Sequence, residues 1–478
     1  MMANAHMPAK ADQALGLMPR TRRIHFIGIG GAGMSGIAEV LMNLGFEVSG
    51  SDQTNSATLE RLKRLGASVS VGHAAEHINN VDVVVVSGAV GEDNPEWQAA
   101  VEARIPVVAR AQMLGELMRF RAGIAIAGSH GKTTTTSMVA AILAQAGLDP
   151  TFVVGGLIHA YGTNARLGQG QYLVAEADES DASFLKLTPM MALVTNIDRD
   201  HLDAYQGSFD RLQSAFLEFL HHLPFYGVAV LCIDDPHVNQ LLGHVARNVV
   251  TYGFSDRADV RASGVVQHGA RMAFELHLPN TDSQSVELAL PGRHAVQNAL
   301  GAAAVAWELG VAATDIVAGL QAFSGVGRRF EPMGTLVLSG QRQVLAFEDY
   351  GHHPTELDAV IQAARGGWPD KRLVLVFQPH RFTRTRDQFD AFARVLAEPD
   401  VLILADIYPA GEAPIPGIDS QALAEAITQR GDDAVQRIHS VDEAEACIDR
   451  VCQDGDLLLV MGAGNVGRLA QTLRRSLT

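Results

Sequence analysis

The sequence predicts an α/β protein with three domains: a Rossmann-like N-terminal domain, a central domain of the P-loop type and a Rossmann-like C-terminal domain. A glycine-rich turn follows the first apolar segment, at residues 28–36. A second apolar segment, residues 123–127, runs into Gly-Ser-His-Gly-Lys-Thr. From residue 344 onward, strand-like and helix-like segments alternate. Such alternation is typical of parallel sheets covered by helices, and 478 residues are enough for two to four domains.

The domain boundaries follow from these segments. We expect a disordered tail over residues 1–22, because this stretch contains Pro8 and Pro19 and has no continuous apolar core; it is therefore not a signal peptide. The expected domains are the N-terminal domain at 23–121, the central domain at 122–331 and the C-terminal domain at 332–478.

Composition excludes several classes of function. The net charge of −16 argues against nucleic acid or an anionic membrane as the main partner. Three scattered cysteines are too few for a disulfide framework or a zinc site. No apolar run approaches the roughly 18 residues of a membrane span. We therefore expect a cytoplasmic protein without nucleic-acid or membrane partners, and a homodimer remains open.

The segment 123–136 predicts a nucleotide-phosphate site. In a strand, tight loop and helix N-terminus, backbone N–H groups surround phosphate oxygens, Lys132 reaches the terminal phosphates and a threonine hydroxyl can ligate Mg²⁺. The usual spacing would place glycine at position 126, where this chain has Ile126, so the loop is a shortened variant. The alternative is a plain turn. The predicted binding residues are Gly128, Ser129, His130, Gly131, Lys132, Thr133 and Thr134.

The first domain predicts a diphosphate site at a helix N-terminus. The pattern Gly28-x-Gly30-x-x-Gly33, with Asp52 after the second strand, is a Rossmann-type start that would ordinarily indicate NAD. The pattern alone is weak, so the group that carries the diphosphate remains open. A later strand near 106–112 ends at Arg110, which is either a ligand contact or a surface charge.

Two strands of the central domain end in polar residues. Residues 172–175 run directly into Glu176-Ala-Asp-Glu-Ser-Asp, which predicts a Mg²⁺ site with Glu176 as ligand; a solvated acidic loop is the alternative. The strand near residue 192 leads to His201 among three aspartates, which places His201 for a second cation or for a structural role. Further on, His294 and Asn298 share one face of an Ala-rich helix at i, i+4.

The third domain predicts another parallel sheet. Expected strands lie at 344–347, 372–377, 401–405 and 456–461, and polar side chains follow each of them. Open α/β sheets bind ligands at the carboxyl ends of their strands, so we expect a ligand site there.

These motifs occur together in one order, and the set closely resembles the Mur ligases, specifically their alanine-adding branch. The resemblance covers about residues 22–470. It rests on the motifs at 28–35, 128–135, 176–184, 195–197, 200–203, 292–294, 327–330, 349–356 and 378–384. The last two read Asp-Tyr-Gly-His-His-Pro-Thr-Glu and Gln-Pro-His-Arg-Phe-Thr-Arg, and are long enough to exclude chance.

The resemblance implies an ATP- and Mg²⁺-dependent amide ligase of peptidoglycan synthesis with UDP-N-acetylmuramate and L-alanine as substrates. It implies an acyl phosphate on the sugar carboxylate, which the amine of alanine attacks. The central domain would then be the ATPase domain, and the glycine turn would hold UDP instead of NAD. Alternatives are a ligase that attaches a preformed peptide, a nicotinamide-dependent oxidoreductase and a non-catalytic nucleotide sensor.

The resemblance also implies roles for individual residues. Catalysis would involve Lys132, Glu176, His201, His352 and Arg381. Mg²⁺ would be held by Thr133, Glu176 and His201. ATP would also meet His294, Asn298 and Arg329. Alanine or the acyl phosphate would meet Tyr350, His352, Arg381 and Arg384. The UDP-sugar would meet Gly30, Gly31, Gly33, Met34, Ser35, Asp52, Ser87 and Arg110. One departure, Ala295 where the family often has asparagine, leaves an adenine-side hydrogen bond in doubt.

Overall fold

The computed structural model describes residues 18–430 and 435–475. Most of the predicted tail, residues 1–17, lies outside the described residues. Within these described ranges, no helix is both long and apolar enough to cross a membrane.

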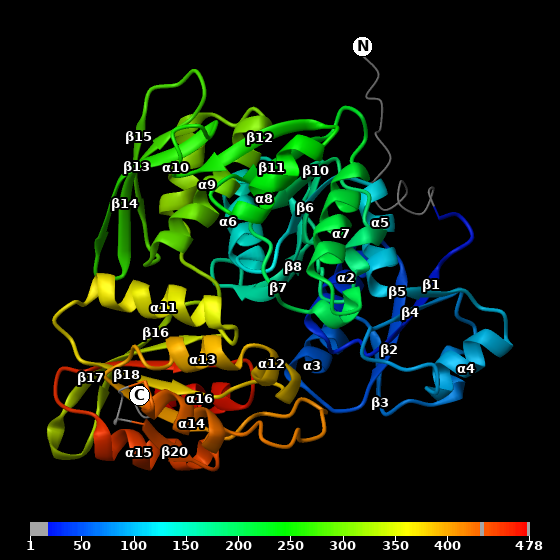
Figure 1. The fold of residues 1–478 in the computed structure, drawn as a ribbon. Coiled ribbons are helices and arrows are strands. Elements are labelled where there is room, and N and C mark those ends of the chain that lie inside the picture. Colours follow the sequence, from blue (N-terminus) through cyan, green and yellow to red (C-terminus); the bar gives the residue numbers. More distant parts are fainter. Residues whose placement is uncertain (1–17, 431–434, 476–478) are drawn as a thin grey trace. The chain divides into compact units, whose positions relative to one another are not determined.

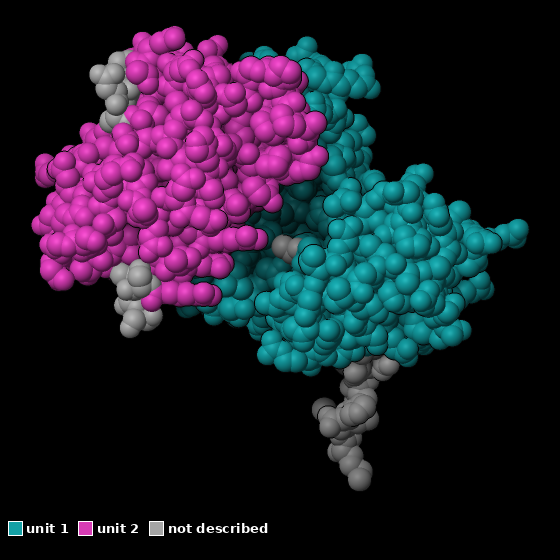
Figure 2. Space-filling model, turned by 90° about the horizontal axis from the view of Figure 1, so that it is seen from below, with its two compact units in different colours: residues 1–261, 277–284, 298–322 teal, residues 262–276, 285–297, 323–478 magenta. Residues whose placement is uncertain are grey.

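The described residues form three sheets, whose strands are labelled in Figure 1. It divides into two compact units, coloured separately in Figure 2. Unit 1 comprises residues 1–261, 277–284 and 298–322, and unit 2 comprises 262–276, 285–297 and 323–478. The three sheets and their covering helices confirm the predicted three-domain α/β fold class.

The first sheet is parallel throughout and has the order β3-β2-β1-β4-β5. Its strands are β1 (Arg23–Ile27), β2 (Glu47–Asp52), β3 (Ser68–Val71), β4 (Val83–Val86) and β5 (Val107–Ala109). Its helices are α2 (Ala32–Asn43), α3 (Ala57–Arg64), η1 (Ala75–Ile78), α4 (Pro95–Glu102) and α5 (Arg110–Arg119).

Strand β4 shows why its four consecutive valines form a central strand. Val83 and Val85 enter one hydrophobic core with α2 and α5, whereas Val84 and Val86 enter another with Ala100 of α4. Alternate side chains of a strand point to opposite faces, so a strand covered on both faces is apolar throughout. The predicted strand near 106–112 is shorter than expected, and Arg110 begins helix α5 instead of ending a strand.

The second sheet has ten strands in the order β15-β14-β13-β12-β11-β10-β6-β9-β7-β8. Its strands are β6 (Ala122–Ala127), β7 (Thr151–Ile158), β8 (Thr163–Arg166), β9 (Tyr172–Glu176), β10 (Met191–Val194), β11 (Val228–Cys232), β12 (Asn248–Gly253), β13 (Val260–His268), β14 (Arg271–His277) and β15 (Gln284–Leu288). Its helices are α6 (Lys132–Gln145), η2 (Ser183–Lys186), η3 (Leu202–Tyr205), α7 (Phe209–His221), α8 (Pro236–Leu241), η4 (Leu242–His244), α9 (Arg293–Glu308) and α10 (Ala313–Gln321).

Within unit 1 the first two sheets are joined by one continuous hydrophobic core. Side chains of α2, such as Ile37 and Leu41, belong to the same buried cluster as Ala125 of β6 and Phe216 of α7. Helix α2 also contacts the hairpin β7–β8. The glycine turn before α2 and the loop after β6 are therefore held in one body.

The third sheet has the order β16-β17-β21-β18-β19-β20. Its strands are β16 (Glu331–Val337), β17 (Gln343–Asp349), β18 (Leu373–Phe377), β19 (Val401–Ala405), β20 (Val435–Ile438) and β21 (Leu457–Met461). Its helices are η5 (Ser339–Gln341), α11 (Pro354–Gly367), α12 (Phe382–Asp387), α13 (Phe389–Val395), α14 (Ser420–Thr428), η6 (Val441–Glu443), α15 (Ala444–Val451) and α16 (Val466–Arg475).

This sheet differs from the expected one at an edge. Strand β16 runs antiparallel to β17, with an irregularity between Pro332 and Gly334. Proline cannot donate a ladder hydrogen bond and is tolerated at edges and bulges, which suits β16 at the end of the sheet. The other strands pair in parallel, so their carboxyl ends share one edge.

Candidate active site

The phosphate loop lies between two polar strand ends. Strand β6 pairs in parallel with β9 on one side and β10 on the other, with Ile126 opposite Glu176 and Ala127 opposite Val194. Because neighbouring parallel strands end at the same edge, residues 128–131 are flanked by the acidic segment after β9 and by the segment after β10.

Two positions in this loop require glycine. Gly128 has φ +127°, and a Cβ there would lie 2.1 Å from Oγ1 of Thr195. Gly131 has φ +83°, and a Cβ there would lie 2.5 Å from Oδ1 of Asn298. Any side chain would clash and would also occupy the left-handed region that glycine tolerates best. The structure thus brings Asn298, predicted on the ATP side, next to the loop.

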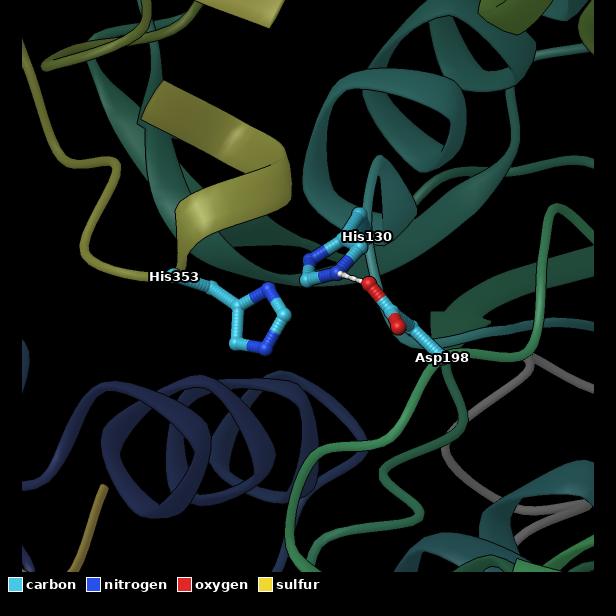
Figure 3. A group of neighbouring side chains, drawn as sticks. All are labelled: His130, Asp198 and His353. Carbon is cyan, nitrogen blue, oxygen red and sulfur yellow. Dashed lines mark hydrogen bonds and ion pairs between the residues drawn. The ribbon is translucent and has the colours of Figure 1, made fainter. Parts of the chain in front are cut away.

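The segment after β10 fixes the loop by hydrogen bonds. The His130 N–H donates to Oδ1 of Asn196 at 2.8 Å, and the Asn196 amide donates back to the His130 carbonyl at 3.1 Å. Nε2 of His130 lies 2.9 Å from Oδ2 of Asp198 (Figure 3), and the Asp198 N–H donates to Oγ of Ser129 at 2.8 Å. Sequence reasoning gave Asn196 and Asp198 no role at the loop, although the motif Thr-Asn-Ile at the end of a strand was the signal for them.

The ammonium of Lys132 is engaged by the acidic segment. Its Nζ lies 2.7 and 3.0 Å from the two carboxylate oxygens of Glu179 and donates to the Gly128 carbonyl at 2.6 Å. Burial lowers the pKa of Lys132, but the carboxylates of Glu179, Asp178 and Glu176 together raise it more, so the pKa lies above its ordinary value and the lysine is charged. Glu179 was part of the predicted acidic segment without an assigned role.

Of the three predicted metal ligands, Glu176 and Thr133 offer the kind of donor that Mg²⁺ prefers, and His201 does not. Glu176 ends β9, and one of its carboxylate oxygens accepts the Gly155 N–H at 2.7 Å. Thr133 lies in the first turn of α6. Carboxylate and hydroxyl oxygens are hard ligands of the kind that Mg²⁺ prefers, whereas the imidazole of His201 is softer. The oxygens of Glu176 and Thr133 therefore fit the ion.

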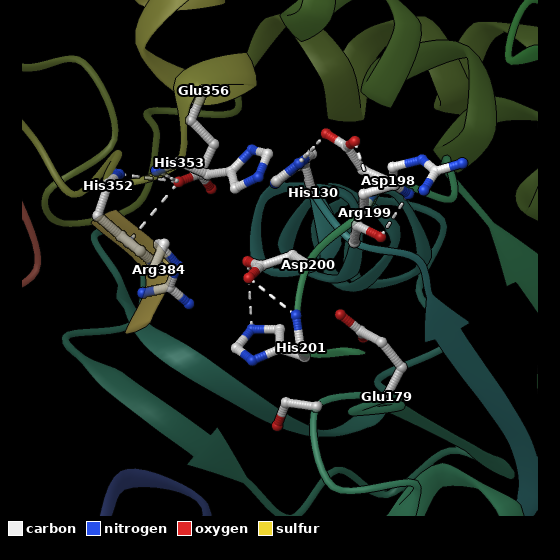
Figure 4. A network of polar contacts seen from close by, with 12 residues as sticks. His130, Glu179, Asp198, Arg199, Asp200, His201, His352, His353, Glu356 and Arg384 are labelled. Carbon is white, nitrogen blue, oxygen red and sulfur yellow. Dashed lines mark hydrogen bonds and ion pairs between the residues drawn. The ribbon is translucent and has the colours of Figure 1, made fainter. Parts of the chain in front are cut away.

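His201 lies in a segment that is held by hydrogen bonds and an ion pair. Its Nε2 lies 3.4 Å from Oδ2 of Asp200, and its N–H donates to Oδ1 of the same residue at 2.9 Å (Figure 4). Four residues later, the Tyr205 hydroxyl donates to the main-chain carbonyl of Glu179 at 2.5 Å. The exit of β10 is thereby connected to the acidic segment after β9.

The predicted diphosphate site, the glycine turn at residues 28–36, is held in place by Asp52 and covered by Arg110. The Gly30 N–H donates to Oδ2 of Asp52 at 2.9 Å, so Asp52 fixes the turn through its main chain. A Cβ on Gly33 would lie 2.9 Å from Nη1 of Arg110, and Nη2 of Arg110 lies 3.8 Å from a carboxylate oxygen of Asp178. Arg110 therefore sits over the turn and faces the acidic segment of the second sheet.

One cavity of unit 1 joins the two predicted sites. It has a volume of about 270 Å³. Its lining includes Gly31, Gly33, Met34, Ser87, Arg110, Glu176 and Asp178. Residues predicted to meet the sugar nucleotide thus share a cavity with the predicted metal ligand Glu176. Gly30 and Ser35 line a neighbouring cavity of about 320 Å³ with Arg61, Thr163 and Asn164.

Unit 2 gathers the predicted amino-acid residues at the ends of β17 and β18. The ring centroids of Tyr350 and His352 are 5.3 Å apart, and those of His352 and His380 are 5.8 Å apart. The His352 N–H donates to Glu356 at 2.9 Å (Figure 4). Nη1 of Arg384 lies 3.5 Å from Nδ1 of His380. Within this unit, aromatic rings and arginines form one cluster.

Arg381 adopts an unusual backbone. Its φ of +73° is rare for a residue with a side chain. Its N–H donates to the Tyr408 carbonyl at 2.8 Å, and Glu412 accepts both the N–H and the hydroxyl of Thr383, at 3.0 and 2.6 Å. Such conformations persist where the surroundings hold them and are common at functional sites.

Two further predicted ATP residues lie in unit 2. The guanidinium of Arg329 lies over the Tyr350 ring at 5.3 Å, and one of its nitrogens lies 3.6 Å from Glu356. Burial, helped by the positive charge of Arg329, lowers the pKa of His294 to about 4, so His294 is neutral near pH 7.

Comparison with known proteins gives a consistent family. Models of the Mur ligase family match three parts of the chain: its catalytic domain at 23–122, its middle domain at 126–306 and its glutamate ligase domain at 328–464. The chain is 59% identical over 451 residues to the UDP-N-acetylmuramate–L-alanine ligase of Xanthomonas campestris pv. campestris (strain B100), with 94% of each chain covered. It is also 59% identical over 449 residues to the ligase of that name from Xanthomonas axonopodis pv. citri, with the same coverage.

Solved structures agree. The UDP-N-acetylmuramate-alanine ligase MurC of Thermotoga maritima matches with a TM-score of 0.79 and 27% identity, covering 95% of this chain and 98% of that one. The murein peptide ligase of Psychrobacter arcticus matches with a TM-score of 0.70 and 25% identity, over 95% and 98%.

Proposed function

The chain belongs to the Mur ligase family, and we propose that it joins L-alanine to the lactyl carboxylate of UDP-N-acetylmuramate. The products are UDP-N-acetylmuramoyl-L-alanine, ADP and phosphate, and the reaction belongs to peptidoglycan precursor synthesis in the cytoplasm. ATP is the co-substrate and Mg²⁺ the cofactor. The high identity to relatives that carry the alanine ligase name supports this choice over other members of the family.

One observation carries the proposal beyond the family likeness. The cavity that contains Gly31, Gly33 and Arg110 also contains Glu176 and Asp178. A sugar nucleotide whose diphosphate lies on the glycine turn would extend its acyl end toward the metal ligand and the phosphate loop. A nicotinamide enzyme would need no such connection to a second phosphate site.

We propose a division of labour among the three predicted domains. Residues 23–121 bind the UDP-sugar, residues 122–331 bind ATP and Mg²⁺, and residues 332–478 bring the amino acid. The glycine turn with Asp52 supports the first role, the loop at 128–134 the second, and the cluster of His352, Arg381 and Arg384 the third.

The residues suit an acyl-phosphate reaction. A carboxylate is a poor electrophile until the γ-phosphoryl group is transferred to it, and catalysis of that step consists mainly of positioning and charge neutralisation. Lys132, held charged by Glu179, would neutralise the β- and γ-phosphates. An arginine fork such as Arg381 suits the alanine carboxylate or the acyl phosphate. Thr133 and Glu176 would hold one Mg²⁺, and His201 and Glu176 a second; these ions would supply positive charge against the developing phosphate charge.

The test is an acceptor panel with UDP-N-acetylmuramate fixed. Phosphate release should require ATP, Mg²⁺, the sugar nucleotide and L-alanine together. Release that needs no amino acid would contradict the proposal, and a tripeptide preferred over free alanine would favour the peptide-attaching ligase instead. Failure to release phosphate with any acceptor, despite nucleotide binding, would favour a sensor.

A further inference from the structure

The acidic segment after β9, residues 176–181, already forms an ion pair with the Lys132 ammonium, the group that would neutralise the phosphates of ATP. Nζ of Lys132 contacts both carboxylate oxygens of Glu179, at 2.7 and 3.0 Å, and lies 2.6 and 3.3 Å from the carbonyls of Gly128 and Ser129. An ammonium group has three N–H donors, so these acceptors already use its full capacity. A phosphate oxygen can reach Lys132 only by displacing one of them.

The Glu179 carboxylate is also kept in place. Its side chain is 2% exposed, and that of Lys132 is 15% exposed. The main-chain carbonyl of Glu179 accepts hydrogen bonds from the Tyr205 hydroxyl at 2.5 Å and from the Ala182 N–H at 3.0 Å. The backbone at Glu179 is therefore fixed, so release of the lysine requires a side-chain rotation and not a movement of this part of the chain.

The negative charge around Lys132 affects how a phosphate group can bind there. Glu179 contacts Lys132 directly, and the charges of Glu176 and Asp178 also act on it, so one ammonium faces the negative charge of three carboxylates. Without compensation, a phosphate that enters this site meets a neutralised lysine and an excess of negative charge. A divalent cation at the carboxylates would offset the excess and would compete with Lys132 for Glu179.

We propose that Glu179 is a positioning residue that couples ATP binding at Lys132 to the divalent cation. Its carboxylate blocks Lys132 in the absence of the metal and releases it when the metal compensates the acidic segment. The site then accepts the nucleotide together with Mg²⁺ and discriminates against metal-free nucleotide and against free phosphate. This inference rests on the ATP site proposed above and assigns a role to a residue outside the phosphate loop.

If the ion pair between Lys132 and Glu179 only stabilises the fold, the expected effect on nucleotide binding is different. Removal of one partner from a buried pair generally costs stability, because it leaves the other charge buried and uncompensated. If Glu179 only supports the structure in this way, its loss would weaken nucleotide binding under all conditions. Coupling predicts the opposite for metal-free nucleotide, because a released Lys132 gains a free N–H and its full charge.

The experiment measures binding of the imido analogue of ATP by titration calorimetry, with Mg²⁺ and with EDTA, and without sugar nucleotide. Since a hydrogen bond to a charged group contributes about 1.5–3 kcal/mol, E179Q should bind the metal-free analogue about tenfold more tightly than the unmodified chain. The affinity with Mg²⁺ should change less, so the gap between the two conditions narrows.

The matched control is E60Q. Glu60 pairs with Lys63 at 3.0 Å, but both side chains are well exposed on α3, so E60Q should leave both affinities unchanged. E179D keeps the charge on a shorter arm and should retain most of the metal dependence; it also serves if E179Q does not fold.

The outcomes separate this inference from the proposed function. Metal-free binding by E179Q that is unchanged or weaker, or loss of the metal dependence in E179D equal to that in E179Q, would overturn the coupling. If the unmodified chain binds no analogue even with Mg²⁺, the ATP site itself is wrong.

Discussion

Arg110, the first residue of α5, lies 3.8 Å from Asp178, two residues beyond the end of β9. The contact joins a cation of the first sheet to the acidic segment of the second. Because Arg110 also covers Gly33 of the glycine turn, its guanidinium is available to a diphosphate placed on that turn. This position favours a ligand contact for Arg110 over a mere surface charge, and the two interpretations can be tested directly.

We expect R110Q to weaken binding of UDP-N-acetylmuramate about tenfold, as for the loss of one charge-assisted contact, and to leave binding of the ATP analogue unchanged. Calorimetry with each ligand measures both. Arg119 of the same helix pairs with Glu116 and is 65% exposed, so R119Q is the matched control. Equal sugar-nucleotide affinities in R110Q and R119Q would show that Arg110 is only a surface charge.

Lys132→Ala should lower kcat by at least about 100-fold, because a charge that stabilises the transferred phosphoryl group is lost. Binding of UDP-N-acetylmuramate should survive, since the glycine turn and Arg110 are unchanged. Steady-state phosphate release and calorimetry measure the two quantities, and circular dichroism verifies the fold. If a folded variant loses both phosphate release and binding of UDP-N-acetylmuramate, the ATP site and the sugar-nucleotide site are not separate.

Gly128→Ala should destabilise the chain and raise the KM for ATP. The new Cβ would lie 2.1 Å from Oγ1 of Thr195, so either the loop or the end of β10 must move. Gly147 is the control, because it also has a positive φ, +72°, but no atom lies within 4 Å of its Cβ position. G147A should therefore show only the backbone strain, about 1–2 kcal/mol, with an unchanged KM. Similar KM values for the two variants would contradict a steric role for Gly128.

The sequence predicted the parts of this site that follow from strand ends and missed those that depend on pairing between segments. Gly128, Lys132 and Glu176 each follow an apolar strand or its loop, and the order of parallel strands places them at one edge. The partner of Lys132 was not predictable, because Glu176, Asp178 and Glu179 are all carboxylates of one short segment. Only the backbone path, fixed by Tyr205, selects Glu179.

In the fold, too, features set by local sequence were predicted and features set by tertiary position were missed. Apolar strands such as 401–405 were placed correctly, because a strand buried on both faces is apolar along its length. The antiparallel edge strand β16 was missed, since Pro332 and Gly334 are typical of a linker and the edge position that tolerates them is a tertiary property. The hairpin β7–β8 was missed for a related reason: Gly155 and Gly156 interrupt the first strand.

A buried carboxylate in the first domain gives a prediction about stability. Glu96 of α4 is fully buried; Nδ1 of His77 lies 2.6 Å and Nε2 of His25 lies 3.3 Å from its oxygens, and the Ser51 hydroxyl donates to it at 2.5 Å. Burial raises the pKa of Glu96, but the hydrogen bonds from His25, Ser51 and His77 together lower it more, to about 2. The carboxylate is thus strongly favoured in the folded state.

A folded-state pKa below the unfolded value of 4.5 stabilises the fold at every pH above that value, and the contribution is lost as the pH falls from 4.5 toward about 2. E96Q should therefore lower the free energy of unfolding by about 3 kcal/mol at pH 7, and the difference from the unmodified chain should shrink below pH 4.5. Urea denaturation across a pH series measures this. E102Q, at an exposed position of the same helix, should show no such difference. A gap between E96Q and the unmodified chain that stays constant down to pH 3 would mean that the histidines stabilise this region by packing, independently of the charge on Glu96.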